Sequence, residues 1–308
     1  MFHDNQNIST DISGWDLSNV TNMNDMFANV NSFNSDLGDW CVTGVTTRPN
    51  NFTSQNNTAI QDPYWGYCGR DNLPDNPMIL RVSTNGNQYG FEMGNANVLV
   101  DWNNGRVDTY SGGNISPRYD NFSGGTRDVR IFGTAERFTS TAVTSNRTTA
   151  IISFGDLGLV SLNGAFRDMP QLNAVADLPS TVRSLQRLMQ DNETANPSGI
   201  ENWDVSLVDN MEEAFQRARN MNQNLDNWTT GSVTNMRNMF DDADSFNANI
   251  SGWDVSNVTN MTGMFSRANI FNQDLSGWCV SNIGSQPNEF NTNGVLASEN
   301  FPVWGTCN

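Results

Sequence analysis

Apolar residues in the C-terminal half of the chain recur in columns spaced 25 residues apart. The columns are Trp203, Trp228, Trp253 and Trp278, then Met211, Met236 and Met261, then Phe215, Phe240 and Phe265. Clusters of Asn, Asp, Gly and Ser interrupt each 25-residue unit. A helix or coiled coil would repeat its apolar positions without such a reset. The pattern therefore predicts internal repeats that bury their apolar columns against neighbouring units.

A polar column accompanies the apolar ones. An asparagine directly precedes the repeat methionine at Asn22, Asn210, Asn235 and Asn260. Stacked buried asparagines can hydrogen-bond backbone groups that a turning chain leaves unpaired, so we predict an asparagine ladder. Within a unit, "VSNVTNM" predicts a short extended segment and "MTGMFSRA" a turn of helix with Met264, Phe265 and Ala268 on one face.

The repeat also sets the phase of the first residues. Met1 and Phe2 align with Met26 and Phe27 at the same spacing of 25. The chain thus opens inside a repeat, which favours a longer protein with an upstream portion. A true start at Met1 is the alternative.

The motifs resemble a known group of surface proteins. Residues 159–189, with "LVSLNGAFRDMPQL" and "LPSTVRSL", resemble the leucine-rich repeat of BspA-like bacterial surface proteins. The "WDVSNVTNM" units are similar to the related 25-residue repeat of BspA-like and mycoplasma-type surface lipoproteins. The resemblance implies a leucine-rich-repeat-like solenoid of short parallel strands and short helical turns. It also implies adhesion to a protein or glycan ligand on a cell or particle surface.

The four cysteines lie in two copies of one terminating sequence. "DWCVTGVTTRPNNF" leads to "DPYWGYC", and "GWCVSNIGSQPNEF" leads to "FPVWGTC". We predict Cys41–Cys68 and Cys279–Cys307 disulfides that cap the solenoid ends, each stabilising by roughly 3 to 4 kcal/mol, with Trp65 and Trp304 packed nearby. The alternatives are a metal site or a reactive thiol, but the sequence has no CxxC and its one histidine is His3. Disulfides imply an oxidising, extracytoplasmic setting or a particle that matures outside the cell.

Between the two repeat regions the composition changes. Residues 70–77, "RDNLPDNP", predict a linker. Six runs then have strand character, at residues 78–84, 89–93, 97–102, 106–110, 127–133 and 148–155. "VDWNNG" resembles a strand-turn signature of PKD-type immunoglobulin-like domains. We therefore predict four segments: a capped repeat end at 1–69, the linker, an antiparallel Ig/PKD-like β-sandwich at 78–155, and a second capped solenoid at 156–308.

Charge limits the partners. The formal net charge is -17, because the chain has 33 acidic residues and only 16 basic residues, all of which are arginine. A surface this negative repels nucleic acid and anionic lipid. No apolar run approaches the roughly 20 residues of a membrane span. We expect neither a nucleic-acid partner nor a membrane span.

Candidate chemistry is sparse. Nucleophilic catalysis would need His3 at the chain start, and Glu212–Glu213 is a carboxylate pair that we interpret as a solvated face. The acidic run 241–244 matches no calcium-loop pattern, and Ca²⁺ at the β-region or its linker is the alternative to bland acidity. The tryptophan column favours packing over a carbohydrate platform.

We therefore expect no catalytic residue and no resident cofactor or metal. The predicted function is a non-catalytic extracellular or cell-surface protein that acts in adhesion or ligand binding, with the binding face unassigned. The alternative is a structural subunit or arm of an extracellular filament or phage virion fibre, which would self-assemble or join other structural subunits.

Overall fold

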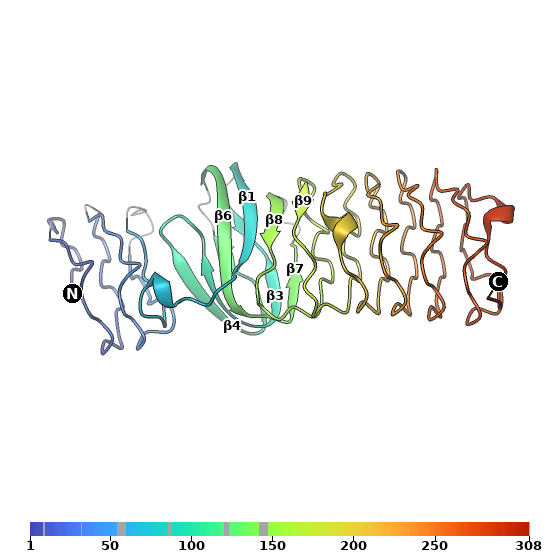
Figure 1. The fold of residues 1–308 in the computed structure, drawn as a ribbon. Coiled ribbons are helices and arrows are strands. Elements are labelled where there is room, and N and C mark those ends of the chain that lie inside the picture. Colours follow the sequence, from blue (N-terminus) through green and yellow to red (C-terminus); the bar gives the residue numbers. More distant parts are fainter. Residues whose placement is uncertain are drawn as a thin grey trace.

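The molecule is elongated, and its β-sheet stands between two groups of repeat units (Figure 1). The computed structural model describes residues 1–8, 10–31, 33–53, 60–85, 88–119, 123–141 and 147–307. The N-terminal units occupy one end, the sheet follows, and the longer run of units extends to the opposite end. The two termini of the chain therefore lie far apart.

Seven strands form one mixed sheet, in the order β4-β3-β6-β1-β8-β9 with β7 paired to β3. The strands are β1 (Met78–Asn85), β3 (Glu92–Asp101), β4 (Val107–Ile115), β6 (Ser123–Thr134), β7 (Arg137–Thr139), β8 (Thr148–Ser153) and β9 (Ala174–Val175). β2 (Tyr89–Gly90) and β5 (Arg118–Tyr119) form a separate antiparallel pair. Pairing is antiparallel except between β8 and β9, which are parallel.

The sheet is buried on both faces. Along β3, Val98 and Val100 belong to the core that continues through the C-terminal units, whereas Leu99 belongs to the core of the N-terminal units. β6 divides in the same way, with Ile131 in the first core and Phe132 in the second. Because side chains alternate between the faces of a strand, one sheet can seal two cores at once.

Successive repeat units are joined by a ladder of backbone hydrogen bonds. The N–H groups of Met211, Glu213, Phe215 and Arg217 donate to carbonyls of the next unit at 2.8–2.9 Å. The intervening N–H groups, of Ala214, Gln216 and Ala218, donate back within their own unit. Both sets of buried backbone groups are thereby satisfied without regular strands.

Each unit carries two residues in the left-handed backbone region. They are the third and seventh after the repeat asparagine: Glu213 and Arg217, Asn238 and Asp242, and Gly263 and Arg267, all with φ between 51° and 65°. A right-handed α-helix cannot contain such residues. The prediction of a helical turn over "MTGMFSRA" is therefore wrong, because the segment is a series of tight turns.

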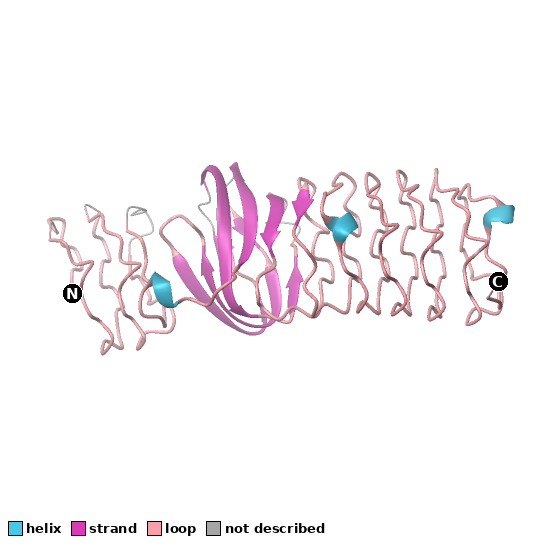
Figure 2. Cartoon of the chain, viewed as in Figure 1, coloured by secondary structure: helices cyan, strands magenta, loops and turns pink. Residues whose placement is uncertain are grey.

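The predicted fold class is also wrong. The described residues contain no α-helix, and their helical segments are three short 3₁₀ turns: η1 (Arg70–Asn72), η2 (Ile200–Asn202) and η3 (Ser298–Asn300). The repeat units are mainly turns and loops, joined by isolated parallel bridges such as Asn210–Asn235 (Figure 2). This is not a leucine-rich-repeat-like solenoid of parallel strands and helical turns.

The predicted β-sandwich fails for a topological reason. Each of the six strand-like runs contains residues of a strand, but the main strands pair into one mixed sheet rather than two packed antiparallel sheets. β9 joins this sheet from residues 174–175, inside the region expected to be repeats. Nothing in the sheet supports a PKD-type module.

The left-handed backbone conformation of Gly263 leads to a testable prediction. A Cβ added at Gly263, where φ is +65°, would lie 2.1 Å from Oδ1 of Asn238. We expect Gly263→Ala to lower the free energy of unfolding by about 1–2 kcal/mol, because the left-handed region penalises a side chain. Chemical denaturation measures the difference.

Gly252→Ala in the same unit is the matched control, since a Cβ there meets nothing within 4 Å. The control should leave stability nearly unchanged. Equal effects of the two substitutions would contradict the role assigned to the left-handed turn.

Candidate functional site

The tryptophan column links each repeat unit to the preceding unit by hydrogen bonds. Trp203, Trp228, Trp253 and Trp278 are only 1–3% exposed. Their indole N–H groups donate to the carbonyls of Ala176, Ile200, Leu225 and Ile250 at 2.8–3.2 Å. The rings of Trp228 and Trp253 also stack at 6.2 Å. A column this buried cannot serve as a carbohydrate platform.

The methionine and phenylalanine columns form the interior. Met211, Met236, Met261, Phe215, Phe240 and Phe265 are all fully buried. Phe240 stacks against Phe215 at 5.5 Å and against Phe265 at 5.8 Å. These residues therefore lie away from any ligand surface.

The asparagine column acts mainly through local turns. Asn210, Asn235 and Asn260 are half-buried and Asn22 is exposed, so the column is less buried than expected. Each Oδ1 accepts from the backbone N–H two residues later, at 2.9–3.1 Å. The backbone of the column supplies the β-bridges between units, and the side chain of Asn235 adds a hydrogen bond from its Nδ2 to Glu212 of the preceding unit at 3.1 Å.

Arginines and carboxylates cross between neighbouring units. Arg187 reaches Glu213 at 2.7 Å, and Arg237 reaches Glu212 at 2.9 Å. Glu213 is buried, so the interpretation of this pair as a solvated face is wrong for Glu213. Its conformation explains the difference, since the left-handed backbone at Glu213 is part of the tight turn. The pair is engaged in ion pairs between units.

The acidic run 241–244 is likewise paired with arginine. Asp241 contacts Arg267 at 2.8 Å, and Asp242 and Asp244 contact Arg219 at 3.0 and 3.6 Å. In the part of the chain that the structure describes, no three His, Cys, Asp or Glu side chains gather in a way that could hold a metal ion. His3 lies beside Asp4, with Nδ1 2.8 Å from Oδ2.

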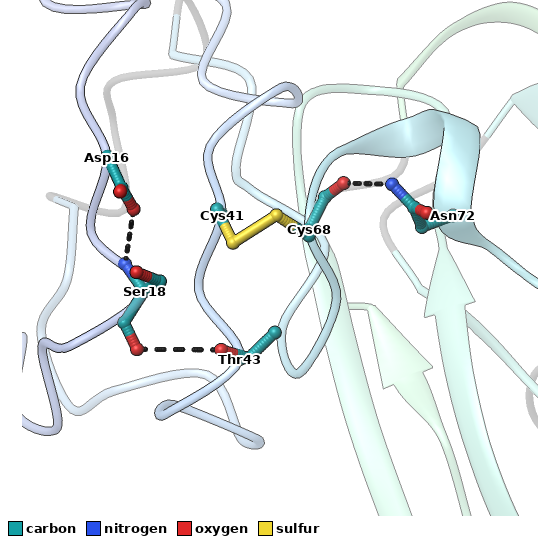
Figure 3. The surroundings of a disulfide bond; sticks show 6 residues. All are labelled: Asp16, Ser18, Cys41, Thr43, Cys68 and Asn72. Atoms are coloured by element: carbon teal, nitrogen blue, oxygen red, sulfur yellow. Dashed lines mark hydrogen bonds between the residues drawn. A yellow bond between two sulfur atoms is a disulfide. The ribbon is translucent and has the colours of Figure 1, made fainter.

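Disulfides join both predicted cysteine pairs, Cys41–Cys68 and Cys279–Cys307. Figure 3 shows Cys41 one unit beyond Asp16, with which it forms a parallel bridge. Cys68 returns antiparallel to Cys41, and its carbonyl accepts from Nδ2 of Asn72 at 2.5 Å. The disulfide thus closes the N-terminal units immediately before the sheet begins.

The first cap is docked on the β3–β4 hairpin of the sheet. Trp65 is 1% exposed, and its indole N–H donates to the carbonyl of Val107 at 2.9 Å. Tyr64 donates its hydroxyl to Asp101 at 3.3 Å. The backbone N–H of Asp62 donates to Gly105. These contacts bind the cap to the sheet.

A buried ion pair accompanies the docked cap. Asp62 lies 2.7 Å from Arg48, and burial raises the pKa of its carboxyl to about 6 although Arg48 opposes the shift. Sequence reasoning missed Asp62, Arg48 and Tyr64. A signal was present, because Asp62 and Tyr64 correspond to Phe301 and Val303 in the otherwise similar second cap.

Among the described residues, no strand of the sheet lies against the second cap (Figure 1). Val303 is 52% exposed, whereas Tyr64 at the equivalent position is buried. Trp304 is partly buried and packs edge-on against Phe290 at 5.0 Å. The two caps therefore share a disulfide and a tryptophan but present different outer surfaces.

The geometry defines a class of protein: a disulfide-capped repeat protein with a β-sheet built into its core. The chain matches the family described as "Mycoplasma protein of unknown function, DUF285" over residues 1–65 and 183–303. This match covers more than half of the 308 residues, so the chain belongs to that family. The sheet region falls outside the match.

No curated protein and no solved structure matches the chain. None of the helices in the described ranges is long and apolar enough to cross a membrane.

The indole hydrogen bond between units can be tested at Trp253. Trp253→Phe keeps a ring in the column but removes the indole donor, so the carbonyl of Leu225 keeps only the backbone N–H of Trp228. We expect a loss of about 0.5–1.5 kcal/mol in the free energy of unfolding, measured by chemical denaturation. Trp15→Phe is the control because Trp15 is 37% exposed. A loss no greater than in that control would refute the hydrogen-bond role.

The raised pKa of Asp62 predicts that the stability of the docked first cap depends on pH. Its folded pKa of about 6 lies above the ordinary value of 3.8, so its favourable contribution is complete below about pH 4 and is lost as pH rises through 6. As pH rises from about 4 to about 6, the unfolding free energy of the native chain should therefore fall by up to about 3 kcal/mol relative to that of Asp62→Asn. Denaturation at a series of pH values measures it, and a difference independent of pH would contradict the burial of the ionised carboxyl.

Proposed function

We propose that this chain is a non-catalytic extracellular surface protein that binds a ligand on another cell or particle. The observation that carries the proposal is the continuous hydrophobic core from Met78 to Leu296, which makes the sheet and the C-terminal units one body. A continuous core resists bending, and such a body holds a recognition surface away from its attachment point. The carboxylates of the repeat face support binding over catalysis because arginines of neighbouring units engage them.

The disulfides support the extracellular location. Both cysteine pairs are bridged, and free cysteines are absent from the described chain. Structural disulfides persist in oxidising compartments and are rare where thiols are kept reduced. Membership of a Mycoplasma family agrees with the surface role that the resemblance to BspA-like and mycoplasma lipoproteins implies.

Two measurements test this proposal. An antibody against the chain should label intact, unpermeabilised producing cells, and labelling only after permeabilisation would overturn the extracellular location. The purified chain should also bind saturably to host-cell monolayers. The reduced and alkylated chain is the control and should bind less because its caps are opened. Absence of saturable binding would overturn the adhesive role.

A specific observation favours a second candidate, a structural subunit that assembles end to end. The outer face of the second cap exposes Val303 where the first cap packs Tyr64 against the sheet. Light scattering and electron microscopy decide between the candidates: ordered filaments support the structural subunit, and a stable monomer excludes it.

A further inference from the structure

A cleft of about 340 Å³ separates the first cap from the sheet face formed by β4, β3 and β6. Small-molecule sites commonly have volumes of about 300–1,000 Å³. None of the described residues lining this cleft is charged, although the chain has a net charge of -17. The cleft is therefore a neutral surface on an acidic protein.

The sheet side of the cleft consists of two cross-strand rows. The strand register places Leu99 opposite Thr109 on β4 and Phe132 on β6. The next row on the same face places Asn97 opposite Ser111 and Thr134. The first row supplies an apolar floor with one hydroxyl, and the second supplies an amide between two hydroxyls. All six residues line the cleft.

The cap side adds the half-buried aromatic ring of Tyr67 and a fixed backbone. Trp65 and Tyr67 line the cleft. The backbone around Tyr67 is held at both polar groups, because its N–H donates to Tyr64 and its carbonyl accepts from Val42, both at 3.0 Å. The ring is thus attached to a fixed wall and needs little ordering when a ligand binds.

The strands beneath the polar row are closely packed. At Gly133, where φ is +111°, a Cβ would lie 2.3 Å from the carbonyl oxygen of Asn97. The glycine lets β6 and β3 approach closely beneath the polar row.

We propose that this cleft binds a neutral oligosaccharide. A sugar ring offers hydroxyl groups to the exposed amide and hydroxyl side chains of Asn97, Ser111 and Thr134. Its apolar C–H face suits the half-buried aromatic ring of Tyr67. The absence of a cation among the described lining residues, together with the acidic surface, disfavours sialylated or sulfated glycans. The inference rests on the proposed ligand-binding function and names its ligand class.

The second cap indicates one site per chain. Thr306 occupies the position equivalent to Tyr67 in "VWGTC" and "YWGYC", and in the described part of the chain the sheet residues Leu99 and Phe132 pack with the N-terminal units. The duplicated cap therefore lacks both the aromatic ring and the facing polar row. Tyr67→Thr converts the first cap to the residue of the second cap at this position.

The test uses the full chain on an array of neutral and sialylated oligosaccharides, followed by calorimetric titration with the strongest neutral glycan. We expect one neutral glycan per chain and no preference for its sialylated form. Tyr67→Thr and Asn97→Ala should each weaken binding by about tenfold, which corresponds to 1.4 kcal/mol. Thr306→Ala in the second cap is the matched control and should bind normally. Unchanged thermal unfolding midpoints will show that the variants remain folded.

Three results would overturn the inference: no neutral glycan bound, unchanged affinity in both cleft variants, or host-cell binding that survives removal of cell-surface glycans. In the last case the proposed surface function would stand while its ligand would be a protein. Loss of glycan binding with retained host-cell binding in Tyr67→Thr would likewise separate the cleft from adhesion.

Discussion

The structure depends on the hydrogen-bond ladder that joins each repeat unit to the next. Alternate N–H groups, such as those of Met211 and Glu213, donate to the following unit, so every residue must lie beside its equivalent one repeat away. An insertion inside a unit would displace this register and leave buried backbone groups unpaired. The constant spacing of Trp228, Trp253 and Trp278 follows from this requirement.

The sheet solves a related problem where the repeats are interrupted. Stacked units expose an apolar layer at each end, and that layer must be covered. β3 and β6 cover two such layers by directing Leu99 and Phe132 to the N-terminal units while Val98 and Ile131 face the C-terminal ones. The first cap is joined to the sheet through Trp65 and Asp62. On the side of the C-terminal units, the parallel pairing of β8 with β9 joins the sheet to the repeats. The same arrangement leaves the cleft between cap and sheet.

Parts of this organisation could be predicted because they recur locally. The two terminating sequences indicated which cysteines pair, and the Trp, Met and Phe columns indicated the buried positions. The tight turns that replace the expected helical turns could not be predicted in the same way. Arg267 and Glu213 adopt the left-handed conformation although neither is glycine, because hydrogen bonds to the next unit outweigh the local preference for a helix. The sandwich failed because strand partners as distant as Met78 and Ile131 are not encoded in any local pattern.

By itself the sequence determined the repeat spacing, the buried columns and the residues that cap the ends, since each unit must match its neighbour. Tertiary structure alone decided that one sheet serves two cores, that Asp62 is buried against Arg48, and that Tyr67 and Asn97 line the same cleft. The physical reason is that these contacts join segments without a periodic relation. Their geometry arises only when the cap, the hairpin and the sheet pack together.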